Sequence, residues 1–159
     1  MKALIIHATR TGNTTRVAEA VADGMRAAGG SVEIIRIDEA PLVFAGDVDL
    51  VVIGGPTEGH SMTPQMEAYL DRLPAGALDG RAVTAFDTRV SWPKLLSGSA
   101  ADRIRDRLTR AGARLVAPVE SFIVSMKPEI RPEELERART WGHSLAGAIE
   151  PSPVAGLAH

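Results

Sequence analysis

The residues best suited to chemistry in this chain form a short polar turn, Thr9-Arg10-Thr11-Gly12-Asn13-Thr14. The turn follows an apolar run at residues 2–7 and precedes a stretch in which apolar residues recur every four positions. This order places the turn at a helix N-terminus, where unpaired amide groups and partial positive charge favour a phosphate. Threonine hydroxyls can add donors, and Gly12 allows the backbone to approach an anion closely. We therefore expect an anion-binding loop; the simpler alternative is a helix N-terminus capped by threonine and asparagine.

The spacing of residues in this turn excludes two common nucleotide loops. It has neither the G-x-G-x-x-G of dinucleotide-binding units nor the G-x-x-x-x-G-K-[ST] of P-loop proteins. The chain has no G-x-S-x-G, and its four histidines lack metal-ligand spacing. It also has no cysteine, which excludes disulfides, iron–sulfur clusters and a cysteine nucleophile. We therefore assign neither a metal site nor a catalytic side chain.

Two further polar segments follow apolar runs and could contact the same ligand. Residues 54–60 read Gly-Gly-Pro-Thr-Glu-Gly-His. The other segment begins at Asp87-Thr88-Arg89 and is expected to form a loop as far as Gly98. A connection of about ten residues between a strand and a helix is long, and long connections are often functional. The alternatives are a plain strand-to-helix turn for the first segment and a surface connection for the second, with Trp92 packing beside Pro93.

Hydrophobic periodicity predicts the elements that position these loops. Strands alternate with helices, which implies a parallel sheet covered by helices on both faces. Residues 39–47 contain Pro41 and Gly46 and are interpreted as a short or degraded helix. The expected strands are residues 2–7, 31–37, 49–53 and 81–86, with a fifth within 114–124 that is bent or broken at Pro118. The expected helices follow the polar turn as far as Gly29 and cover residues 63–73, 99–112 and 132–149.

Length and composition are those of one globular domain. The chain has 159 residues, of which 45% are hydrophobic and 24% charged, and its net charge is −2. We expect one domain over residues 1–150 and a flexible C-terminal tail at 151–159. The nearly neutral charge argues against a nucleic-acid partner. No stretch approaches the roughly 20 apolar residues of a membrane span, so we expect no membrane insertion and a cytoplasmic location.

The turn at residues 9–14 resembles the T-x-T-G-N-T phosphate loop of the flavodoxin family, and the order of elements resembles that family over residues 1 to about 150. The resemblance implies a flavodoxin-like three-layer α/β sandwich, with a five-stranded parallel sheet of order 2-1-3-4-5 and FMN at the switch point. It also implies that the Glu58-Gly59 peptide can flip to hydrogen-bond the reduced flavin. The residues that it assigns to cofactor binding are Thr9, Arg10, Thr11, Gly12, Asn13, Thr14, Pro56, Thr57, Glu58, Gly59, His60, Asp87, Thr88, Arg89 and Trp92.

The sequence departs from that family in two respects. Flavodoxins commonly stack the flavin between a tryptophan and a tyrosine, whereas the aromatic content here is 4%. Stacking is therefore expected on one side only, from Trp92, with His60 or Met62 on the other face. The second departure is charge, because many electron-carrier flavodoxins are strongly acidic. Arg10, His60, Arg89 and Lys94 are expected near the flavin, where cations stabilise its anionic reduced form and raise its potential.

The resemblance supports three functions. The first is electron transfer between redox partner proteins, a reductase and an acceptor, by a monomer or weak dimer. The second is an oxidoreductase with its own small substrate, such as a quinone or porphyrinogen. Residues 7–12 also resemble the start of flavodoxin-like protoporphyrinogen oxidases, but those tend to read T-R-D-G-Q-T, so Thr11 and Asn13 favour the general flavodoxin type. The third is a flavodoxin-fold binding protein that has lost FMN.

Overall fold

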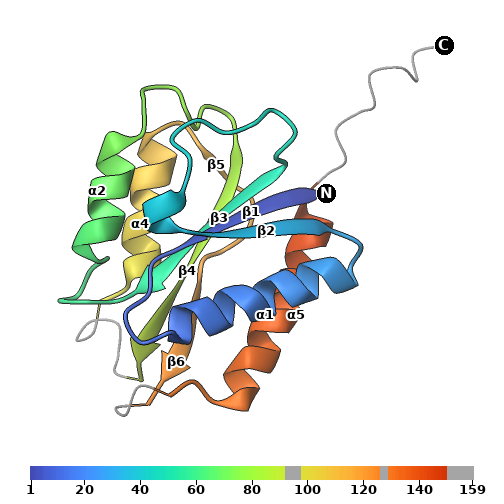
Figure 1. Cartoon of the computed structure of the whole chain (residues 1–159), viewed down its shortest axis with the longest axis vertical. Coiled ribbons are helices and arrows are strands. Elements are labelled where there is room, and N and C mark those ends of the chain that lie inside the picture. The colour runs from blue at the N-terminus through green and yellow to red at the C-terminus, as the bar shows by residue number, and fades with distance from the viewer. Residues whose placement is uncertain (92–97, 126–128, 150–159) are drawn as a thin grey trace.

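The apolar runs form a twisted parallel sheet through the middle of the molecule (Figure 1). This computed structural model describes residues 1–91, 98–125 and 129–149. The strand order is β2-β1-β3-β4-β5, with β6 also paired to β4, which confirms the predicted order 2-1-3-4-5. The strands are β1 (Lys2–His7), β2 (Ser31–Arg36), β3 (Leu50–Pro56), β4 (Ala82–Val90), β5 (Arg114–Leu115) and β6 (Glu120–Val124).

The fifth position of the sheet is filled by two short strands instead of one, so the sheet has six strands among the described residues. Both β5 and β6 run parallel to β4 and pair with its opposite ends. Pro118 lies in the gap between them, where it has no amide hydrogen to donate to the sheet. The predicted break at this proline is therefore confirmed.

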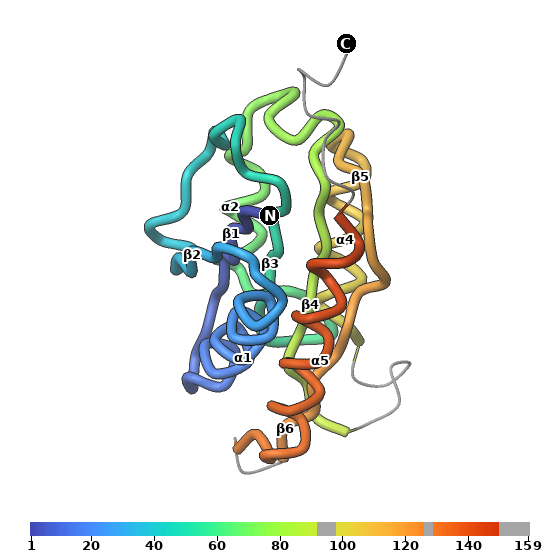
Figure 2. The backbone as a smooth tube through the Cα atoms, turned by 90° about the vertical axis from the view of Figure 1, so that its right-hand side faces the viewer, coloured from blue at the N-terminus to red at the C-terminus, as the bar shows by residue number. Residues whose placement is uncertain are grey.

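Helices cover both faces of the sheet and complete the predicted three-layer sandwich. One face packs against α1 and α5, and the other against α2 and α4, so the sheet separates two hydrophobic cores (Figure 2). None of the helices in the described part of the chain has the length and apolar character of a membrane-spanning segment. In the described residues the helices are α1 (Asn13–Ala27), α2 (Pro64–Arg72), α4 (Ala100–Arg110) and α5 (Pro132–Ala148), together with the 3₁₀ turn η1 (Ile37–Glu39).

The short helix expected over residues 39–47 does not form. The 3₁₀ turn η1 ends at Glu39, and the following residues are irregular. Pro41 and Gly46 both disfavour helix. The segment is held instead by side chains from elsewhere: the Tyr69 hydroxyl donates to the carbonyl of Pro41 at 2.6 Å, and the Arg81 guanidinium donates to the carbonyl of Val48 at 2.9 Å.

Two strands extend beyond their predicted ends, and this changes the surroundings of several candidate residues. Strand β3 continues to Pro56 and β4 continues to Val90. Asp87, Thr88 and Arg89 therefore belong to β4 and do not begin a loop, which corrects the sequence-based boundary. The apolar run stops at Phe86, but pairing of β4 with β3 and β6 continues past it, so the backbone stays extended.

The α1 and α5 helices cross at two glycines, where their backbones touch. A Cβ atom on Gly24 would lie 2.0 Å from the carbonyl oxygen of Arg139, and one on Gly142 would lie 2.1 Å from that of Val21. Such distances leave no room for a side chain at either position. This crossing holds α1 against the sheet, and α1 in turn carries the polar turn at its N-terminus.

We predict that Gly142→Ala destabilises the protein by about 1–3 kcal/mol or more, because a methyl group must force two helices apart. Gly147→Ala is the matched control on the same helix, since Gly147 is exposed and a Cβ atom there would have nothing within 4 Å. There the greater helix propensity of alanine should stabilise by up to about 1 kcal/mol. Urea denaturation of both variants measures the difference; equal midpoints would contradict the close crossing.

Candidate functional site

The turn at residues 9–14 connects β1 to α1 and leaves the N-terminus of α1 without a side-chain cap. The capping position is Gly12, whose φ of 87° lies in the left-handed region that suits glycine. By contrast, Thr63 caps α2 and Ser99 caps α4 through their side-chain oxygens. The first turn of α1 also contains no acidic residue. Within the described residues, this N-terminus therefore keeps the amide groups and partial positive charge that suit an anion.

Hydroxyl and amide side chains fix the shape of this turn. The Thr9 hydroxyl accepts a hydrogen bond from the Gly12 amide at 3.0 Å, and the Asn13 side chain donates to the Thr11 hydroxyl at 3.3 Å. Thr14 is buried and its hydroxyl lies 3.0 Å from the hydroxyl of Thr88 on β4. The alternative interpretation was that these residues cap the helix. In the structure, no side chain makes a capping hydrogen bond at the N-terminus of α1. Each hydroxyl group can still make a further hydrogen bond.

The second candidate loop folds as a tight turn over residues 58–61. The amide of Glu58 donates to the carbonyl of Ser61 at 2.7 Å, and the amide of Ser61 donates back at 2.9 Å. Both central residues have positive φ, 52° at Gly59 and 70° at His60, the pattern of a type I′ turn. His60 is the only non-glycine residue with positive φ in the described part of the chain. The central peptide of the turn is thus Gly59-His60, one position later than the Glu58-Gly59 peptide suggested by the family resemblance.

The turn at residues 58–61 contacts Gly98, the residue before the α4 cap Ser99. A Cβ atom on Gly98 would lie 2.2 Å from the carbonyl oxygen of His60, so only glycine permits this contact. The two residues also form an isolated parallel bridge. On its other side the turn is joined to the phosphate-type loop by an ion pair, in which Arg10 Nη1 lies 2.5 Å from Glu58 Oε1. The ion pair is partly exposed, so it orients the loops more than it stabilises the fold.

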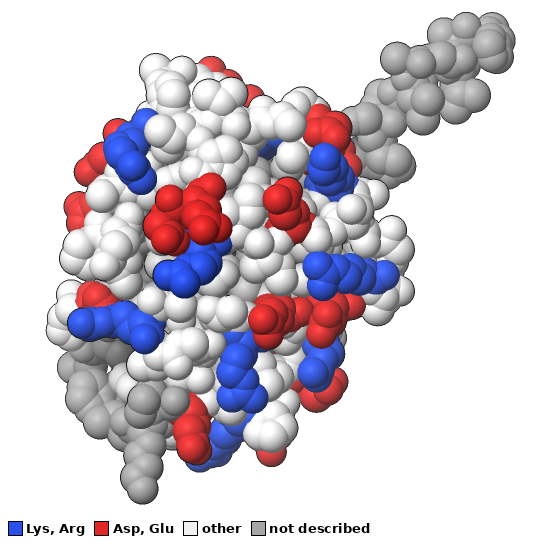
Figure 3. Space-filling model, in the orientation of Figure 1, with Lys and Arg blue, Asp and Glu red and all other residues white. Residues whose placement is uncertain are grey.

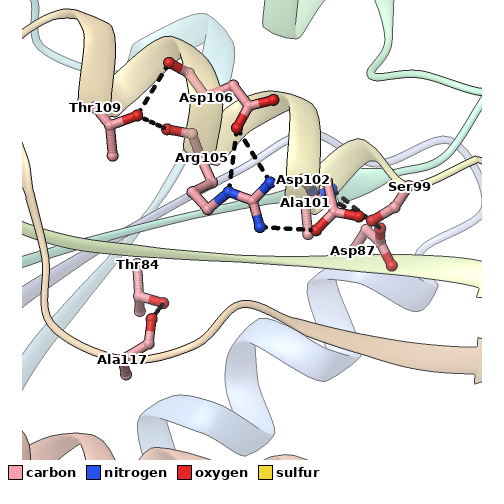
Figure 4. A network of polar contacts seen from close by, with 9 residues as sticks. All are labelled: Thr84, Asp87, Ser99, Ala101, Asp102, Arg105, Asp106, Thr109 and Ala117. Carbon is pink, nitrogen blue, oxygen red and sulfur yellow. Dashed lines mark hydrogen bonds and ion pairs between the residues drawn. The ribbon is translucent and has the colours of Figure 1, made fainter.

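Asp87 lies beneath these loops and is fully buried. Its Oδ2 accepts hydrogen bonds from the Ser99 hydroxyl at 2.7 Å, the Ala101 amide at 3.0 Å and the Thr57 hydroxyl at 3.3 Å (Figure 4 shows the first two). The Thr57 hydroxyl in turn accepts from the Ala100 amide at 2.9 Å. The carboxyl group therefore connects β4, the start of the second loop and the N-terminus of α4.

Other candidate residues lie along the same edge of the sheet. Pro56 pairs with Thr88, whose carbonyl accepts from the Thr57 amide at 2.9 Å, and Arg89 is partly buried near the end of β4. Met62, considered as a stacking residue, is buried in the core beneath α2 and α4. Trp92 and Lys94 lie outside the described residues, as does the expected tail at 151–159.

Some residues that shape the site were missed in the sequence. Gly98 and Ser99 were treated only as the end of a loop and the start of a helix, yet they contact His60 and Asp87 respectively. The available signal was modest: Ser99 is followed three residues later by Asp102, a pattern typical of a helix N-terminus. Nothing local in the sequence indicates which distant carboxyl group such a serine will meet.

His7 is the last residue of β1 and is also buried at this edge. Burial lowers the pKa of its imidazole, and the positive charge of neighbouring Arg36 lowers that pKa further. Its Nδ1 lies 3.4 Å from the Thr15 hydroxyl on α1. The side chain is therefore neutral near pH 7 and can donate one hydrogen bond and accept another.

Comparison with known proteins identifies relatives over much of this chain. The profile of the Flavodoxin family matches residues 5–121. A flavodoxin of Aquifex aeolicus is 34% identical over 95 residues, which cover 57% of this chain and 51% of that protein. An NAD(P)H dehydrogenase (quinone) of Azorhizobium caulinodans is 30% identical over 109 residues, which cover 54% and 55%. The chain thus spans about half the length of these two relatives.

The fold comparison agrees with the family match. The structure of oxidised flavodoxin 1 from Bacillus cereus superposes with a TM-score of 0.78 at 24% identity, covering 94% of this chain and 100% of that one. This likeness shows the shared fold, and the family match covers well over half of the chain. The resemblance noted from the T-R-T-G-N-T turn is confirmed: the chain belongs to the Flavodoxin family.

Proposed function

We propose that this protein holds FMN with its phosphate at the N-terminus of α1 and exchanges electrons with partner proteins through the flavin ring. The observation that carries this proposal is the uncapped α1 N-terminus, which has a left-handed glycine and no acidic residue in its first turn. A phosphate there would accept hydrogen bonds from the first-turn amides and from the hydroxyls of Thr9 and Thr11. When bound, FMN accepts electrons from one partner and passes them to another.

The flavin ring would lie beside the turn at residues 58–61. Several interactions give this turn a defined position before any ligand binds: Gly98 supports it, Arg10 contacts Glu58, and Asp87 fixes Thr57 at its start. A turn that is already ordered loses little conformational entropy when a ligand binds. Its exposed edge offers backbone groups of Gly59 and His60, which can hydrogen-bond the edge of a planar ring.

The surface charge bears on the type of partner. Figure 3 shows basic and acidic side chains interspersed over the face that it draws, with no broad area of one sign. The net charge of −2 agrees with this distribution. A strong single-sign field would steer a partner from a distance, so recognition here would depend more on short-range contacts. The identity of a reductase and acceptor, the monomeric or weakly dimeric state and the cytoplasmic location stay predictions.

A small-substrate oxidoreductase is the second candidate, because one group of relatives carries the name NAD(P)H dehydrogenase (quinone). This chain aligns with about half of such a relative. The described residues show one uncapped helix N-terminus beside the proposed ring position, and we assign it to the phosphate of FMN. Electron transfer between proteins therefore remains the function that the site supports better.

We predict that the protein binds FMN more tightly than riboflavin, which lacks the phosphate. Thr11→Val should weaken FMN by about 1–3 kcal/mol, because it removes a hydroxyl that would face the phosphate, and should leave riboflavin unaffected. Thr15→Val is the matched control, since the Thr15 hydroxyl lies near His7 and not in the turn. Quenching of flavin fluorescence measures all affinities. Equal binding of the two flavins would exclude the phosphate assignment.

A second prediction concerns the turn at residues 58–61. Rotation of its central peptide converts a type I′ turn into type II′, which moves φ of His60 from positive to negative and leaves φ of Gly59 positive. His60 therefore favours the rotated form by roughly 1–2 kcal/mol, the usual cost of a left-handed residue with a side chain. If the rotated peptide binds the reduced flavin, His60→Gly should lower the potential of the first one-electron reduction.

The same reasoning predicts different effects for substitutions at His60 and at Gly59. Gly59→Ala places a side chain at a positive φ in both forms of the turn, so it should weaken FMN binding with little change in potential. This differs from the family resemblance, which suggested that the Glu58-Gly59 peptide flips. Spectroelectrochemical titration of both variants provides the test, and a larger potential shift in Gly59→Ala than in His60→Gly would contradict it.

We also predict that reduced nicotinamides are poor electron donors to the FMN-loaded protein. Rapid, saturable hydride transfer requires a site that holds the nicotinamide nucleotide over the ring. Anaerobic stopped-flow mixing with NADH or NADPH should show slow bleaching that rises linearly with nucleotide concentration. Fast bleaching that saturates would instead establish the protein as a reductase.

A further inference from the structure

A small cavity lies at the carboxyl edge of the sheet, on the outer side of the phosphate loop. Its volume is about 230 Å³. The loop at residues 8–10, the end of β2 at residues 36–38 and the start of α2 enclose it. β1 and β2 are neighbouring parallel strands, so their carboxyl ends meet at this edge (Figure 1). Thr9 and Arg10 line the cavity and also belong to the turn at residues 9–14, whereas Asn13 and Thr14 at the start of α1 do not line it.

Two positive side chains and one negative side chain line the cavity. These are Arg10, Arg36 and Asp38, and Glu58, which pairs with Arg10, adds a second negative charge beside it. Arg36 Nε lies 3.4 Å from Asp38 Oδ1, and both side chains are well exposed, so this ion pair is weak. Arg10 contacts Glu58 through Nη1. Guanidinium groups have several donors, so both arginines can still bind a phosphate.

A buried imidazole forms part of the wall. His7 is only 3% exposed and lines the cavity, and in the sheet it pairs directly with Arg36. Its Nδ1 is near the Thr15 hydroxyl, and the second ring nitrogen can also take part in a hydrogen bond. The neutral imidazole thus adds a polar group suited to a hydroxyl of a ligand.

We propose that this cavity binds a ribose phosphate group, with the phosphate at Arg10 and Arg36 and the sugar hydroxyls at Asp38 and Gln65. Two guanidinium groups with donors to spare match a phosphate ester. The carboxyl group of Asp38 lies in η1, two residues after the end of β2, and in dinucleotide-binding α/β sheets an acidic residue hydrogen-bonds the ribose hydroxyls. The Gln65 side chain at the start of α2 can both donate and accept.

The size of the cavity limits what else it can enclose. Sites that surround a whole drug-sized ligand measure about 300–1,000 Å³. A volume of about 230 Å³ suits a pentose phosphate but not the base of a nucleotide as well. The ribose phosphate could therefore be a free sugar phosphate, or it could belong to a nucleotide whose base stays outside.

The test uses FMN-loaded protein, in which the α1 N-terminus is already occupied. The ¹H and ¹⁵N resonances of the His7 side chain are followed by NMR while ribose 5-phosphate, AMP, ribose or inorganic phosphate is added. Saturable shifts are expected with ribose 5-phosphate, at lower concentration than with either ribose or phosphate alone. Comparable binding of AMP would indicate a nucleotide as the source, and its exclusion would indicate a free sugar phosphate; both results uphold the site.

Three variants complete the design. Arg36→Gln should weaken ribose 5-phosphate by about tenfold or more and should also weaken phosphate. Asp38→Asn should weaken ribose 5-phosphate without weakening phosphate. Arg16→Gln is the matched control, because Arg16 is an exposed arginine on α1 that does not line the cavity. All three positions are exposed, and thermal melting verifies that each variant folds.

The proposal is overturned if His7 shows no saturable shift, or if Arg36→Gln binds as tightly as the Arg16→Gln control. It is also overturned if binding occurs in the flavin-free protein and disappears once FMN is present, because the ligand would then be occupying the FMN phosphate position. These readouts do not depend on whether the flavin exchanges electrons. Failure of this proposal is therefore distinguishable from failure of the proposed function.

Discussion

The buried carboxyl group of Asp87 is the interaction on which the candidate site depends. A carboxyl group in a protein interior is costly unless hydrogen-bond donors replace the lost water. Here Oδ2 receives donors from Thr57, Ser99 and the backbone of Ala101, and the adjacent N-terminus of α4 adds favourable partial charge. Three segments that are far apart in the sequence are thereby fixed to one another. Loss of this group would leave the second loop and the start of α4 without their common partner.

Side chains, not backbone pairing, connect the turn at residues 9–14 to the same framework. Thr14 meets Thr88, the residue after Asp87 on β4, and Arg10 meets Glu58 at the edge of the second loop. The first contact is buried and the second is largely exposed. A buried contact is little affected by salt, whereas an exposed ion pair is screened by it. We therefore expect salt to weaken the Arg10–Glu58 contact more than the Thr14–Thr88 contact.

The crossing of α1 with α5 lies away from the candidate site but helps to position it. Close backbone contact at Gly24 and Gly142 sets the depth at which α1 packs on the sheet, and with it the height of the turn at its N-terminus. The same carboxyl edge carries the cavity beside His7, because β1 ends between the phosphate loop and β2. One edge of a parallel sheet thus carries both the α1 N-terminus and this cavity, and the turn at residues 9–14 borders both.

The class of fold was predictable from local patterns in the sequence: continuous apolar runs for buried strands and four-residue periodicity for helices. The strand order came from the family resemblance of the threonine-rich turn, and the observed sheet confirms that order. The sequence did not predict where β3 and β4 end. Pro56 and Asp87 are residue types common in loops, and only their pairing across the sheet shows that they belong to strands. The type I′ turn could not be predicted either, because histidine is not a residue typical of its second central position, and the turn lies against Gly98, which is distant in the sequence. The tertiary structure decided these features because each depends on groups far away in the chain, and no local pattern records which distant residues will meet.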